Sequence, residues 1–146
     1  MVSQLERALT KAHDLEIGHR DLKPDNIFLV PNGGEVIVKI LDFGVAKSFE
    51  VDLLDTQAVT VPGNTVGTPW YMSPEQLRGA SSDTRGDLWS LAVIVCECLT
   101  GQRPFQAPDL AMFTLLLWNE KRPVPSSLGA VPPGFFVLFS NAAHRD

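Results

Sequence analysis

Residues 19–26 read HRDLKPDN, and this stretch decides how the rest of the chain is interpreted. It places a carboxylate directly after a histidine and an arginine, and it ends in an asparagine. Two short apolar runs follow at 27–30 and 36–41, separated by the turn-forming sequence PNGG at 31–34. Apolar runs around a glycine-containing turn are typical of a β-hairpin, so we expect two antiparallel strands directly after this stretch.

Two further motifs follow in chain order. Residues 42–44 read DFG directly after the second expected strand, and residues 67–75 read GTPWYMSPE. A single DFG triplet would mean little, but three motifs in this order are specific. The simpler interpretation of each polar residue is structural: Asp21 would cap a turn, Asn26 would complete the hydrogen bonds of a loop, and Asp42 would end a strand.

Together these motifs resemble the carboxy-terminal lobe of a eukaryotic-type protein serine/threonine kinase, and they are most similar to the bacterial members of that family. The resemblance implies a mainly α-helical fold with a small β-hairpin (α+β), a kinase large lobe that is truncated and whose small lobe is absent. Residues 1–146 would form one partial kinase domain. It would contain the catalytic loop (19–26), the metal-binding DFG motif (42–44), the activation segment (42–75) and the central helix (87–100).

The resemblance also gives each polar residue a role. Asp21 would orient the substrate hydroxyl and accept its proton, and Lys23 would offer a cation to the transferred phosphate of ATP. Asn26 and Asp42 would supply oxygen ligands to Mg²⁺ or Mn²⁺, which bridges the nucleotide phosphates. Because phosphoryl transfer has a loose transition state, such a site acts mainly by positioning groups and stabilising charge.

Substrate choice is implied by two other features. A lysine two residues after Asp21 accompanies specificity for serine and threonine hydroxyls in this family, so the expected partner is a protein substrate. Gly67 and Thr68 resemble the turn that positions that substrate. The alternative for Thr68 is an ordinary turn hydroxyl.

Arg20 suggests control by phosphorylation of the activation segment, because a phosphate can pair with an arginine and order a loop. Thr56, Thr60 and Thr65 are the candidate acceptors, and Thr60 is the best placed by its spacing from Thr68. The alternative, which is equally open, is that all three threonines are solvated loop residues.

Two helices are expected near the ends of this arrangement. Apolar residues at positions 5, 8, 9 and 12 share one helical face, which predicts an opening helix. Ser3 and Glu6 would form a capping box at its start, unless the sequence begins inside a longer helix. A further helix is predicted over 109–119.

Residues 88–99 are apolar almost all round, which predicts a buried helix at the centre of the domain. Asp87 would cap its start and Gly101 would end it. By resemblance, Asp87 also holds the backbone of the catalytic loop, and Glu75 pairs with an arginine that this sequence does not supply. Ser73 stands where the family usually has an alanine.

Composition restricts the possible functions. The chain has 146 residues, a formal net charge of -5 and 45% hydrophobic residues, which is typical of one soluble globular domain. The acidic balance argues against a nucleic-acid partner, and the run 88–99 is too short to span a membrane. We therefore expect a cytoplasmic protein without membrane contact, in which Cys96 and Cys98 are reduced, buried thiols.

Some parts of a complete kinase are missing from the sequence. None of its glycines forms the G-x-G of a phosphate-covering loop, and the small lobe would be required for a full ATP site. We therefore expect weak or absent ATP binding and no measurable transfer by the isolated fragment. The first alternative function is a non-catalytic kinase remnant or interaction module. The second, a small-molecule phosphotransferase, is disfavoured because residues 67–75 resemble a protein-substrate segment.

Overall fold

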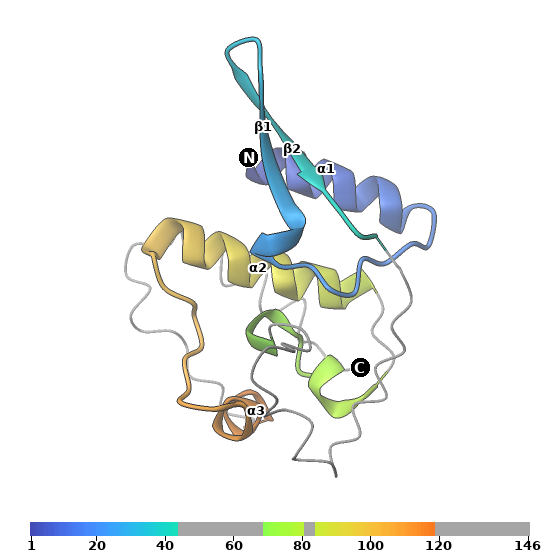
Figure 1. The fold of residues 1–146 in the computed structure, drawn as a ribbon. Coiled ribbons are helices and arrows are strands. Elements are labelled where there is room, and N and C mark those ends of the chain that lie inside the picture. Colours follow the sequence, from blue (N-terminus) through green and yellow to red (C-terminus); the bar gives the residue numbers. More distant parts are fainter. Residues whose placement is uncertain (44–68, 81–83, 119–146) are drawn as a thin grey trace.

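The computed structural model describes residues 1–43, 69–80 and 84–118. This part of the chain contains three α-helices and one two-stranded sheet, and Figure 1 shows α2 crossing the middle of the molecule. The hairpin and α1 lie on one side of α2, and α3 lies on the other. The elements are α1 (Val2–His13), η1 (Pro24–Asn26), β1 (Ile27–Asn32), β2 (Glu35–Ile40), η3 (Pro69–Tyr71), η4 (Gln76–Arg78), α2 (Thr84–Thr100) and α3 (Leu110–Trp118). The mainly helical arrangement with a small hairpin agrees with the expected fold class.

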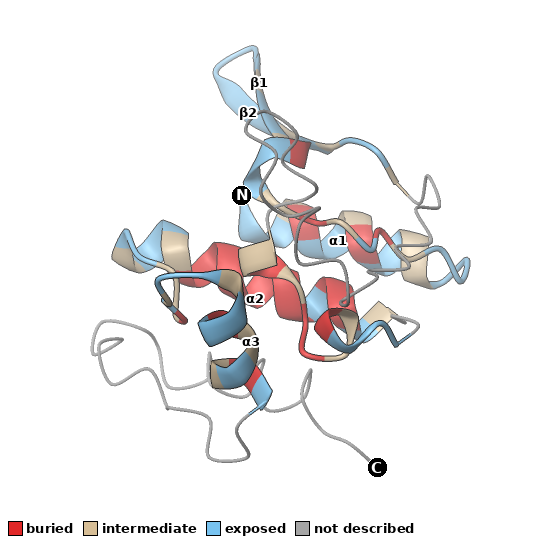
Figure 2. Cartoon of the chain, turned by 60° about the horizontal axis from the view of Figure 1, so that its bottom comes forward, coloured by how far each residue is buried: buried red, intermediate tan, exposed pale blue. Residues whose placement is uncertain are grey.

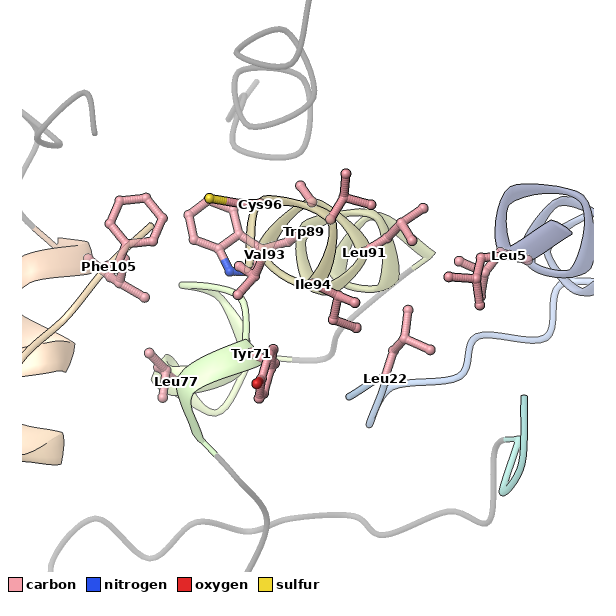
Figure 3. Close-up of a cluster of buried hydrophobic side chains, with 14 of the residues drawn as sticks. Leu5, Leu22, Tyr71, Leu77, Trp89, Leu91, Val93, Ile94, Cys96 and Phe105 are labelled. Atoms are coloured by element: carbon pink, nitrogen blue, oxygen red, sulfur yellow. The ribbon is translucent and has the colours of Figure 1, made fainter. Parts of the chain in front are cut away.

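Helix α2 forms the core of the described residues. Figure 2 shows it buried along most of its length, as its almost uniformly apolar sequence predicts. Its side chains meet Leu5 of α1, Leu22 of the following loop and Tyr71 of η3 (Figure 3). On another side, the Trp89 ring stacks on Phe105 with 5.5 Å between ring centroids.

The expected caps of α2 are half correct. The helix begins at Thr84, so Asp87 lies inside its first turn and does not cap its start as predicted. Gly101 ends the helix as expected, with φ of 74° and its N–H bonded to the carbonyl of Glu97 at 2.8 Å. A residue with positive φ at this position is favoured to be glycine, because it lacks the Cβ that would clash.

Helix α1 buries Leu5 and Leu9 against the core, which confirms the apolar face. The predicted capping box is wrong. The helix begins at Val2 with Met1 at its N-cap, and no side chain caps it. Ser3 therefore lies within the first turn, where its carbonyl accepts a hydrogen bond from Arg7 Nε at 3.2 Å.

The hairpin is present, and both strands reach closer to the turn than predicted, while β2 ends one residue earlier than predicted, at Ile40. Strand β1 pairs with β2 out to Asn32 opposite Glu35, so only Gly33 and Gly34 form the turn. Both have positive φ, 56° and 94°, which is the backbone of a tight two-residue hairpin turn. The open edge of β2 is covered by Gln4 of α1, which donates to the Val36 carbonyl at 3.0 Å and accepts from the Val38 N–H at 2.8 Å.

Helix α3 runs from Leu110 to Trp118, close to the predicted span. Asp109 begins it, because its Oδ1 accepts a hydrogen bond from the Met112 N–H at 2.8 Å. In the ranges that the structure describes, no helix combines the length and the apolar character needed to cross a bilayer.

The two cysteines differ in exposure. Cys96 is buried, as expected, and burial raises the pKa of its thiol. Cys98 is exposed, which corrects the prediction that both thiols are buried. Residues two positions apart point in different directions on a helix, so one can face the core while the other faces solvent.

Candidate active site

Asp87 fastens the start of the catalytic loop to α2. Its side chain is 1% exposed, and its Oδ2 accepts from the backbone N–H of His19 at 2.7 Å while its Oδ1 accepts from that of Arg20 at 2.7 Å. A third donor comes from α1, where His13 Nε2 lies 2.9 Å from Oδ2. A buried carboxylate requires such partners, since losing hydration without them is costly. The loop is therefore tied to both helices.

His19 connects the catalytic loop to the residues after β2. Its ring is buried, and its Nδ1 accepts from the Asp21 N–H at 3.3 Å. The other nitrogen, Nε2, therefore carries the proton and donates to the Leu41 carbonyl at 2.8 Å. The ring also packs edge-on against Phe43, with 4.9 Å between centroids. One side chain thus bridges the HRD and DFG motifs.

Asp21 and Lys23 form an ion pair at the surface of this loop. The Lys23 Nζ lies 2.9 Å from the Asp21 Oδ2, and the Asp21 side chain is 38% exposed. Behind them, the Asn26 Nδ2 donates to the Asp21 carbonyl at 2.8 Å, and Asn26 itself is buried. The carboxylate is thus open to solvent on a backbone that is held in place.

Asn26 and Asp42 flank the hairpin at its base. Asn26 precedes β1 and Asp42 follows β2, and the Leu41 N–H donates to the Asn26 carbonyl at 2.9 Å. Asp42 is exposed and has φ of 59°, so it lies in the left-handed region where the chain turns away from the strand. The pairing of the strands therefore brings these two residues to the same end of the sheet.

The donor atoms at this end fit a hard divalent cation. Because the Asn26 Nδ2 is engaged, its amide oxygen is the atom that could ligate, and Asp42 offers an exposed carboxylate. Mg²⁺ prefers oxygen ligands and is usually held by one or two carboxylates together with phosphates and waters. Among the described residues no cluster of three His, Cys, Asp or Glu side chains could hold a metal by itself. The two residues could therefore supply part of the ligands of such a cation, with phosphate and water supplying the rest.

Several predicted site residues lie outside the described ranges. They are Gly44 of the DFG motif, the acceptor candidate Thr60, and the substrate-positioning pair Gly67 and Thr68. Arg20 is described and exposed, with φ of 65°. Within the part of the chain that the structure describes, Glu75 makes no ion pair.

The sequence analysis did not predict the contact between Tyr71 and Glu97, which lies beside a cavity. The Tyr71 hydroxyl donates to Glu97 Oε2 at 2.7 Å. Burial first, and then the hydrogen bond to Glu97 and its charge, raise the pKa of Tyr71 above its usual value. Both side chains line a cavity of about 450 Å³ together with Cys98 and the apolar residues Met1, Leu5, Pro24, Ile27, Leu29 and Ile94. The signal that could have found it is the lone carboxylate in the apolar run of α2.

None of the four residues expected to handle phosphate and metal lines that cavity; they are Asp21, Lys23, Asn26 and Asp42. Of residues 19–26, Pro24 lines the cavity, so the cavity borders this loop without including those four side chains.

The chain is similar in sequence to known protein kinases. The chain matches the protein kinase domain family over residues 1–123. The serine/threonine-protein kinase Pkn1 of Myxococcus xanthus is 46% identical over 133 residues, which are 90% of this chain and 18% of that protein. PknA, a serine/threonine-protein kinase of Mycobacterium tuberculosis, is 40% identical over 150 residues, covering 99% of this chain and 32% of that protein.

A further relative, the serine/threonine-protein kinase pkn3 of Myxococcus xanthus, is 42% identical over 86% of this chain and 23% of its own length. The chain spans between 18% and 32% of the length of these three relatives. The family match covers most of its residues and includes the HRD and DFG motifs. The chain belongs to the protein kinase family.

Proposed function

We propose that this chain provides the proton-acceptor and metal-binding side of a protein serine/threonine kinase, which transfers the terminal phosphoryl group of ATP to a serine or threonine hydroxyl. The observation that carries the proposal is the solvent-open carboxylate of Asp21, 2.9 Å from the Lys23 ammonium. The three relatives are all named serine/threonine-protein kinases, which supports the same reaction class. The proposed setting is the cytoplasm, where ATP is available.

Asp21 is the proposed general base. Its exposed carboxylate can accept a hydrogen bond from a substrate hydroxyl and take the proton as the oxygen attacks phosphorus. Lys23 neutralises part of the negative charge that gathers around the phosphoryl group. The anchoring of the loop by Asp87 and Asn26 means that little reorganisation is needed when substrate arrives.

Asn26 and Asp42 are the proposed holders of the metal. The Asn26 amide oxygen and the Asp42 carboxylate would bind Mg²⁺ or Mn²⁺, which supplies charge neutralisation to the phosphates of ATP when bound. Gly67 and Thr68 are proposed to position the protein substrate. Arg20 is proposed to bind a phosphate on Thr60.

The experiment is a transfer assay on the full-length gene product with radiolabelled ATP and a mixed protein substrate. Asp21→Asn keeps the shape of the side chain and removes its basicity, so kcat should fall by about 10²–10⁴-fold. The matched control is Asp14→Asn, an exposed carboxyl group in the turn after α1, whose variant should keep the wild-type rate. The proposal fails if the wild-type protein shows no transfer, or if the Asp21 variant is as active as the control. An absence of transfer would favour a binding module without turnover.

A further inference from the structure

The backbone of Arg20, directly before Asp21, is held from two sides. Its N–H donates to Asp87 Oδ1 of α2 at 2.7 Å, and its carbonyl accepts from Gln76 Nε2 at 2.8 Å. Its φ of 65° places a non-glycine residue in the left-handed region. Such a conformation is unfavourable and persists only where surrounding contacts enforce it. The Gln76 hydrogen bond is one of these contacts, made across 56 positions of sequence.

The amide of Gln76 can present only one orientation. Its Oε1 accepts two hydrogen bonds from Ser73, from the backbone N–H at 2.9 Å and from the hydroxyl at 3.0 Å. Ser73 is fully buried, so neither donor can be satisfied by water instead. With its oxygen turned to two donors, the amide must direct its NH₂ group to the Arg20 carbonyl.

We infer that Gln76 is a positioning residue for Asp21: it fixes the left-handed backbone of Arg20 from the carbonyl side, and Ser73 sets the direction of its amide. The inference rests on the proposed function for its catalytic consequence. It also explains why a serine is useful at position 73, where the family usually has an alanine. Ser73 and Gln76, at the end of the activation segment, would then form one unit with the catalytic loop.

The chemistry of this contact requires a glutamine. The side chain must accept from Ser73 and donate to Arg20 with the same planar group. A glutamate has the same length and keeps both acceptor oxygens, but as a carboxylate it has no donor and places a negative charge against a carbonyl oxygen. Gln76→Glu therefore removes the hydrogen bond to the Arg20 carbonyl and keeps an oxygen that can accept from Ser73.

The test compares Gln76→Glu with Gln106→Glu in the full-length gene product. Gln106 is exposed and donates one long hydrogen bond of 3.4 Å, so the same chemical change is made there without consequence for the loop. We expect the Gln76 variant to lose about 10- to 100-fold in kcat, since small misplacements of a catalytic group have effects of this size. The KM for ATP should change by no more than about twofold, because that variant leaves uniform ground-state binding intact.

A second readout is independent of catalysis. Site-resolved hydrogen exchange without nucleotide should show faster exchange at the backbone amides of Arg20 and Asp21 in Gln76→Glu, and unchanged exchange in the β1–β2 ladder. Ser73→Ala keeps the backbone donor and should show the same pattern more weakly. Its effect should be less than additive with that of Gln76→Glu, because both act on one hydrogen-bonded network.

The outcomes separate the inference from the proposed function. Unchanged exchange at Arg20 and Asp21, faster exchange throughout the chain, or a kcat equal to that of Gln106→Glu would each overturn the inference. If the wild-type protein transfers no phosphate, the proposed function fails, while the exchange result still decides whether Gln76 holds the loop.

Discussion

His13, the last residue of α1, donates a hydrogen bond from its Nε2 to Asp87 Oδ2 of α2 at 2.9 Å, and the same oxygen accepts the His19 N–H. One buried carboxylate therefore joins two helices to the catalytic loop. The geometry makes the stability of the domain and the position of Asp21 depend on the same group.

Replacing His13 should destabilise the fold measurably. His13→Ala removes one donor from a carboxylate that is 1% exposed, so the free energy of unfolding should fall by about 1–3 kcal/mol in denaturant titration. His13→Gln retains a donor and should lose less. Lys11→Ala, an exposed basic residue of the same turn, is the control. A His13→Ala protein as stable as this control would show that the contact contributes nothing.

The raised pKa of Tyr71 should make the free energy of unfolding fall as the pH becomes alkaline. Its pKa is raised in the folded state, above a usual value of 10.0, so the folded state holds the proton more tightly than the unfolded state does. The resulting stabilisation is fully present below pH 10 and is lost as the pH rises further, because the unfolded state then releases its proton first.

Tyr71→Phe removes the titrating group, so the difference in unfolding free energy between wild type and variant should shrink between pH 9 and pH 11, on either side of the usual value of about 10. At neutral pH the variant should be less stable by about 1.5–3 kcal/mol, the typical contribution of a hydrogen bond to a charged group. The interpretation of this contact is wrong if the two proteins keep a constant difference across that range.

Replacing Gly34 or Gly18 by alanine should have opposite effects on the free energy of unfolding. Gly34 has φ of 94° in the hairpin turn, so Gly34→Ala should lower the free energy of unfolding by about 1–2 kcal/mol. At Gly18 an added Cβ would meet its nearest neighbours at 3.6–3.7 Å, which is ordinary contact, so Gly18→Ala should be neutral or stabilising by about 0.4–1 kcal/mol. If thermal and chemical denaturation showed the same loss of stability for both variants, the difference in backbone constraint between the two glycines would be contradicted.

Much of the fold could be predicted because the deciding patterns are local. The two apolar runs around the PNGG turn and the all-round apolar run of α2 each specify an element without reference to the rest of the chain. The ends of the elements were less predictable. Asp87 resembles a helix cap in sequence, but its carboxylate bonds to the amides of His19 and Arg20, and the helix begins at Thr84.

The candidate site divides in the same way. Asp21, Lys23 and Asn26 could be named because they share one short motif, and the structure joins them by direct hydrogen bonds. The contacts of His13 and Gln76 could not be predicted, since each depends on a partner 74 or 56 positions away and has no local pattern of its own. The roles of such residues can be identified only when the folded structure shows which partners they contact.

The central claim is that Asp21, Asn26 and Asp42 surround one metal–phosphate centre. The most direct measurement is paramagnetic broadening of the backbone NMR signals of the full-length gene product by Mn²⁺ with ATP. Signals of these three residues should broaden together, and Asp42→Asn should abolish the effect. Signals that stay sharp at these positions, or that broaden instead around Glu97 and the 450 Å³ cavity, would contradict the account.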